Sequence, residues 1–153
     1  MPELVHEFTY QVDLEPPVPV GQGPYGTRFI FGASAGTFEG ERFKGTIAPG
    51  TVDWLLLGPD NIARLDVRAT FHTHDGAAVY LSYFGFFNVT PAIMEILGGG
   101  GQSTAFEDQH FRTNPRFETG DERYAWLNQT MFIGEGRILA SPMGVEYRVY
   151  RVT

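Results

Sequence analysis

The chain has 153 residues, of which 42% are hydrophobic and 14% aromatic, so it can bury the core of one domain but is short for two. It contains no cysteine, which excludes disulfide frameworks, cysteine nucleophiles, zinc ribbons and iron–sulfur sites. The 18 acidic residues outnumber the 11 basic ones, and this charge argues against nucleic acid as a partner. Without a leader-like segment or a long apolar run, we expect no membrane partner and a soluble, cytoplasmic protein.

The first half of the chain reads as a series of strands. Residues Leu4–Leu14 alternate with period two, which predicts a half-buried strand with His6 on its buried face. The segments Thr27–Ser34 and Gly36–Ile47 are rich in phenylalanine and glycine and predict two short, twisted strands. An apolar strand is expected at Val52–Leu57 and another at Ala63–Thr73.

The pair Asp75-Gly76 predicts a hairpin with a two-residue turn, because both residues accept the positive φ of a tight turn. In that register Arg68, His72 and His74 share one face with Tyr83. If this face points outward it is an ordinary solvated surface, and if it points inward it lines a polar pocket.

One short helix is expected at Thr90–Leu97, with Thr90 as its cap and Pro91 in the first turn. Alternation predicts further strands at Tyr124–Phe132 and Val145–Val152. So many short strands favour an all-β, antiparallel, closed or nearly closed barrel that forms a single domain over residues 1–153.

The segment from Phe111 to Asn128 resembles the signature of an uncharacterised family, domain of unknown function 3237. Further matching motifs are Pro49-Gly50 before Asp53-Trp54, Leu65-Asp66-Val67-Arg68 before Asp75-Gly76, and the closing Val149-Tyr150-Arg151-Val152. The resemblance covers nearly the whole chain and implies a lipocalin-like β-barrel, but no particular chemistry.

The segment His72-Thr73-His74 stands where many members of that family have Arg-Thr-Asp, so the histidines cannot take a role from the family. Two residues apart on a strand, they could supply two metal ligands, with His110 or His6 as a third. Because no third ligand is evident nearby, we expect no metal, and a metal-dependent enzyme stays the second alternative.

Asp53 and Trp54 open an apolar strand, where an aromatic wall can raise the pKa of the carboxyl and prepare it for acid catalysis. Asp53 could equally cap the preceding turn. Arg112 lies in a charged loop that could clamp an anion or satisfy its own charges in ion pairs, and it is our candidate ligand contact.

The sequence therefore predicts a small-molecule-binding barrel, and favours a cofactor-free acid/base enzyme (isomerase, cyclase, hydratase or lyase) for a small aromatic or apolar substrate. The alternative is a non-catalytic carrier. The candidate catalytic residues are Asp53, His72 and Arg112. The candidate substrate-binding residues are Trp54, Arg68, His74, Tyr83, His110 and Trp126. The sequence leaves the oligomeric state open, a homo-oligomer included.

Overall fold

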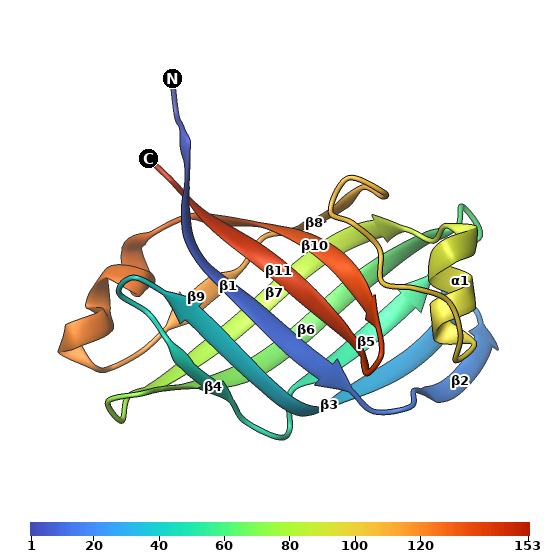
Figure 1. Ribbon diagram of the computed structural model, residues 1–153, viewed down its shortest axis with the longest axis horizontal. Helices are drawn as coiled ribbons and strands as arrows, with labels where there is room; N and C mark the ends of the chain where they lie inside the picture. The colour runs from blue at the N-terminus through green and yellow to red at the C-terminus, as the bar shows by residue number, and fades with distance from the viewer.

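A computed structural model describes residues 1–153, whose strands form one antiparallel sheet closed into a barrel (Figure 1). The strands are β1 (Leu4–Leu14), β2 (Val18–Gly23), β3 (Gly26–Gly40), β4 (Gly45–Ile47), β5 (Val52–Leu57), β6 (Ile62–Thr73), β7 (Ala78–Asn88), β8 (Phe111–Thr113), β9 (Arg116–Glu118), β10 (Phe132–Ala140) and β11 (Met143–Val152). Two helices complete the fold: α1 (Pro91–Leu97) and the 3-10 helix η1 (Glu122–Gln129).

Eight strands make the closed ring, in the order β1, β3, β5, β6, β7, β8, β10, β11 and back to β1. The remaining three are additions: β2 pairs with β3, β4 lies between β3 and β6, and β9 pairs with β7. The first and last strands are neighbours, with Leu4 opposite Val152. The predicted antiparallel barrel with a short helix is confirmed.

Strand β3 replaces the two strands predicted on either side of Ala35. It continues through Gly36, where a Cβ would lie 2.9 Å from the Cβ of Ile47, so only glycine lets the neighbouring segment pass this closely. Only the last three residues of the second predicted strand form the short β4, and residues 41–44 connect it to β3.

The predicted strand Tyr124–Phe132 is wrong. Residues up to Gln129 form η1 instead, where the Asp121 side chain caps the helix by accepting a hydrogen bond from the backbone N–H of Arg123. The strand of this region begins only at Phe132.

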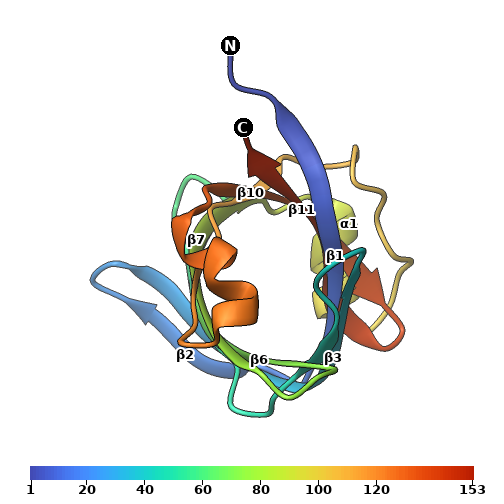
Figure 2. The same cartoon turned by 90° about the vertical axis from the view of Figure 1, so that its left-hand side faces the viewer.

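Helix α1 forms where it was predicted, with the Thr90 side chain accepting a hydrogen bond from the backbone N–H of Ile93. It lies across one end of the barrel, and η1 lies in the opposite opening (Figures 1 and 2). No helix is long and apolar enough to cross a membrane.

The interior of the barrel has two unlike halves. The half near η1 is packed by aromatic rings whose centroids lie 4.4 to 6.3 Å apart; they belong to Phe8, Phe38, Phe43, Phe71 and Phe117. The half near α1 encloses a cavity. Tyr10 and Tyr147 lie between the two halves. Tyr10 contacts the ring of Phe71 on the packed side, and Tyr147 contacts the ring of Phe111 on the cavity side.

Candidate functional site

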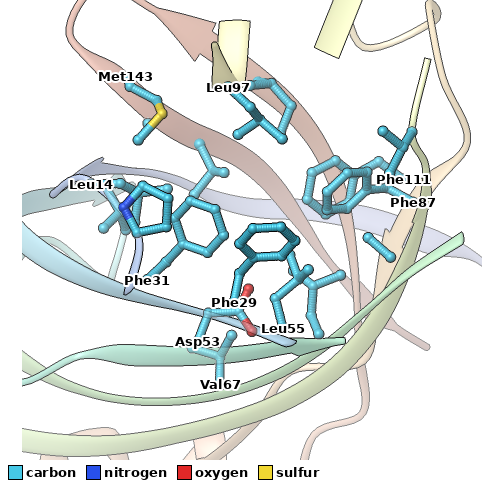
Figure 3. Close-up of a pocket in the computed structure, with 18 of the residues that line it drawn as sticks. Leu14, Phe29, Phe31, Asp53, Leu55, Val67, Phe87, Leu97, Phe111 and Met143 are labelled. Atoms are coloured by element: carbon cyan, nitrogen blue, oxygen red, sulfur yellow. The ribbon is translucent and has the colours of Figure 1, made fainter. Parts of the chain in front are cut away.

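The cavity in the α1 half of the barrel has a volume of about 330 Å³. Of its 24 lining residues, 19 are hydrophobic, and they come from all eight strands of the ring and from α1. Figure 3 shows Phe29, Phe31, Phe87 and Phe111 facing this space, so that aromatic rings form part of a mainly aliphatic wall. A pocket of this size and lining suits a small apolar molecule.

The cavity approaches the surface beside α1. The lining residues Met94 and Leu97 belong to this helix and remain 54% and 36% exposed. Leu97 and Met143 lie on the side of the cavity away from Asp53 (Figure 3). A ligand would therefore enter past the helix and meet Asp53 at depth.

Asp53 points into the cavity from β5 (Figure 3). Its Oδ1 accepts a hydrogen bond from the backbone N–H of Asp66 at 3.2 Å. This amide is available because the pairing of β5 with β6 skips the stretch where Trp54 and Leu55 face β6. The carboxyl thus replaces a ladder contact between strands and does not cap the turn before it.

Burial raises the pKa of the Asp53 carboxyl to about 7. The hydrogen bond from Asp66 N–H lowers that pKa, the Asp66 charge raises it, and the charge of Arg28 lowers it. Near pH 7 the group is present in both its acid and its base form, which is the condition for proton transfer in either direction.

Two buried tyrosines line the cavity, and a third packs against one of them. The hydroxyl groups of Tyr83 and Tyr147 are hydrogen-bonded at 3.1 Å, and both residues line the cavity. The ring of Tyr10 stacks on that of Tyr147 with centroids 4.7 Å apart. Burial, and in part the nearby Asp53 charge, raises the pKa of all three phenols well above the ordinary value, so they stay protonated hydrogen-bond donors.

The hairpin of β6 and β7 has a register different from the predicted one. The backbone N–H of Thr73 donates to the carbonyl of Ala77, so the loop holds three residues, and Gly76 adopts φ +94°. His72 therefore pairs with Ala78 and not with Val79. The shift by one residue moves the side chains of β7 to the opposite face relative to β6.

His72, His74 and Arg68 lie exposed on the outer face of the barrel, away from the cavity. The assignment of His72 to a cavity site is wrong, because the inward positions of β6 belong to residues such as Val67 and Phe71. Tyr83 pairs with Val67 and shares its inward face, so this predicted residue does line the cavity.

Arg112 and Trp54 point outward because their neighbours Phe111 and Asp53 point inward. Arg112 lies 3.7 Å from Glu135 in an exposed ion pair, and the Trp54 side chain is 43% exposed. Neither can contact a ligand in the cavity.

Three further predicted residues also lie away from the cavity. His110 is exposed in the loop before β8, and His6 is exposed where β1 shifts register against β11. Trp126 belongs to η1 at the packed end, where the Arg42 guanidinium lies 3.6 Å from its ring centroid. Of the predicted site, the structure thus brings together Asp53 and Tyr83.

The two histidines of the alternative metal site do not converge on a third ligand. His72 and His74 are exposed, and no group of three or more histidine, aspartate or glutamate side chains gathers anywhere in the structure.

The sequence pattern does not identify Tyr147 and Tyr10 as residues of the site. Both occupy inward positions of alternating strands, and that alternation is the available signal. It shows that a tyrosine is buried, but it does not show that strands so far apart in sequence bring two hydroxyl groups together.

Comparison with known proteins identifies relatives across the whole length. The family described as protein of unknown function (DUF3237) matches residues 2–152. The UPF0311 protein RPA1785 of Rhodopseudomonas palustris is 30% identical over 133 residues, or 86% of each chain. Its crystal structure has a TM-score of 0.91 at 28% identity and covers 100% of this chain and 99% of that one.

Two further crystal structures share the fold. A beta-barrel like protein from Acinetobacter baumannii is 29% identical with a TM-score of 0.84, covering 100% of this chain and 97% of that one. A protein from Penicillium herquei, described as an enzyme, is 19% identical with a TM-score of 0.71, covering 99% of this chain and 95% of that one. This similarity shows a shared fold alone. The match to nearly every residue places the chain in a family: it belongs to the DUF3237 proteins.

Proposed function

We propose that the barrel binds a small, largely apolar substrate in its cavity and transfers a proton on it, with Asp53 as the acid and base. The observation that carries this proposal is the Asp53 carboxyl, which faces an apolar cavity and has a pKa of about 7. No other carboxyl and no histidine lines the cavity.

The reaction follows from the two forms of this group. The carboxylate takes a proton from a carbon or oxygen atom of the substrate, and the resulting carboxylic acid returns a proton to another atom. The Tyr83 and Tyr147 hydroxyls stabilise the negative charge that develops on a substrate oxygen in between. Isomerisation, ring closure, hydration and elimination all balance as such proton transfers, and a fold neighbour described as an enzyme supports catalysis in this kind of barrel.

The test is hydrogen exchange on a neutral carbon acid, β-tetralone, in deuterium oxide, followed by proton NMR. The wild-type protein should accelerate exchange next to the carbonyl, with a rate that rises through about pH 7 as Asp53 ionises. Asp53→Asn should slow exchange by about a hundredfold or more. Glu39→Gln, on the outer face of β3, is the matched control and should keep the wild-type rate. Full activity of the Asp53 variant would refute the proposal.

A carrier is the second candidate, and the predominance of hydrophobic lining residues favours it. A carrier would bind β-tetralone in both the wild-type and the Asp53→Asn protein and accelerate exchange in neither. Measuring affinity beside exchange therefore separates the two functions.

A further inference from the structure

We infer that the cavity selects an uncharged ring compound that carries one carbonyl or hydroxyl oxygen, that the Tyr83–Tyr147 hydroxyl pair binds this oxygen, and that anionic analogues are refused. The inference names the substrate class of the proposed function and rests on it for the location of the site. It is carried by the charges, the hydroxyl groups and the shape of the cavity wall.

The charges of the lining exclude an anion. No lysine, arginine or histidine lines the cavity, and the one ionisable carboxyl there, Asp53, would repel a second negative charge. A buried charge without a partner is costly, and water cannot screen it in an apolar space. A carboxylate or phosphate ligand would therefore lose its hydration and find no counter-ion.

The hydroxyl groups require an acceptor. Tyr83 and Tyr147 carry two hydroxyl hydrogens, and the 3.1 Å bond between them uses one. The pair keeps the other hydrogen for a further acceptor, and both residues line the cavity. A ligand oxygen placed there would accept it.

Tyr10, which does not line the cavity, supports this hydroxyl pair by packing against Tyr147. Its ring is 2% exposed and stacks on Tyr147, while its own hydroxyl has no hydrogen-bond partner. The Tyr147 ring also meets the edge of Tyr83 and of Phe111, with centroids 5.6 and 5.3 Å away. Because three neighbouring rings fix the Tyr147 ring, its hydroxyl group has a defined position for binding a ligand.

The shape of the wall selects a ring. Phe87 and Phe111 lie with ring centroids 4.7 Å apart on one side of the cavity, and Phe29 and Phe31 face the same space from β3. These aromatic parts of the wall gain most from a flat ligand, because stacked and edge-to-face contacts add to simple burial. The volume of about 330 Å³ is at the small end of ligand pockets and fits a compound of about two fused rings.

The test compares three probes with the same two-ring skeleton: β-tetralone, the hydrocarbon tetralin, and the anion tetralin carboxylate. Affinities are measured by isothermal titration calorimetry at pH 8, where Asp53 is mostly ionised. We expect β-tetralone to bind about tenfold more tightly than tetralin and at least tenfold more tightly than the carboxylate.

The double substitution Tyr83→Phe and Tyr147→Phe should abolish the advantage of the ketone over tetralin and leave tetralin affinity unchanged, because only the two hydroxyl groups are lost. Tyr150→Phe, on the same strand as Tyr147 but bonded to Glu135 at 3.4 Å outside the cavity, is the matched control and should change neither affinity. Binding of the carboxylate as tight as that of the ketone, an unaltered preference in the protein that lacks both hydroxyl groups, or no binding of any probe would overturn the inference. If the ketone binds as expected but Asp53-dependent exchange is absent, the catalytic proposal fails while the ligand class stands.

Discussion

The Asp53 carboxyl combines one stabilising contact with an unfavourable environment. The backbone N–H of Asp66 favours its ionised form, but the apolar walls of the cavity disfavour that form more strongly. The balance gives a pKa of about 7, against 3.8 for an exposed aspartate. The folded state therefore holds a proton on Asp53 at pH values where the unfolded chain has released it.

This difference makes stability depend on pH. Between about pH 4 and pH 7 the folded state binds more protons than the unfolded state, so the free energy of unfolding falls as pH rises and the loss is complete above pH 7. Asp53→Asn removes this titration. We therefore expect the free energy of unfolding of the variant to exceed that of the wild type by up to about 4 kcal/mol at pH 8 and by little at pH 4. Urea unfolding at both pH values measures this gain. An equal pH dependence in the two proteins would contradict it.

Individual residues of the site are only partly predictable from the sequence. An aspartate that begins an apolar strand is a recognisable feature, and Asp53 is found that way. The same alternation forces Trp54 outward, so the pair Asp53-Trp54 could not both face one cavity. The hydroxyl pair of Tyr83 and Tyr147 depends on the closure of the barrel, since its members are 64 residues apart in sequence.

In the hairpin of β6 and β7, one additional turn residue determines which side chains of β7 face the cavity. Asp75-Gly76 correctly indicates a turn, but the loop also includes His74, and the added residue exchanges the faces of β7 relative to β6. The existence of both strands is predictable from alternation. Their register depends on the hydrogen bonds of the turn, which several loop lengths can satisfy.

Thr73 holds this three-residue loop. Its Oγ1 accepts a hydrogen bond from the backbone N–H of Ala77 at 2.8 Å and donates to Asp75 Oδ1 at 2.7 Å. Thr73→Val keeps the shape but leaves the buried Ala77 N–H without this partner, so we expect a loss of about 1–3 kcal/mol in the free energy of unfolding. Thr73→Ser keeps the hydroxyl and should lose clearly less. Chemical denaturation checks both, and equal losses would refute the role of the hydroxyl.

The whole molecule joins a packed half to a hollow half within one barrel. In the packed half, Phe71 is fully buried and meets the rings of Tyr10, Phe38 and Phe117. In the other half, Phe29 lines the cavity and remains partly exposed. The packed half supplies rigidity, and the space for a ligand lies where packing is incomplete.

The two halves should respond differently to the same substitution. Phe71→Ala removes a ring with neighbours on all sides, so we expect it to cost about 3–5 kcal/mol. Phe29→Ala should cost markedly less, because part of its ring contacts no protein atoms. Thermal and urea unfolding of both variants provide the measurement. Equal losses would mean that the cavity wall is packed as tightly as the core.

The pairing of β1 with β11 has a consequence for synthesis of the protein. Ribosomes add about 5–20 residues per second, so β1 emerges roughly 7–30 s before the strand that covers its edge. During this time the nascent chain carries an unpaired strand edge beside its apolar side chains, the kind of surface that associates with other chains. The barrel therefore cannot close until β11 has been synthesised, and until then this edge of β1 is open to association with other chains.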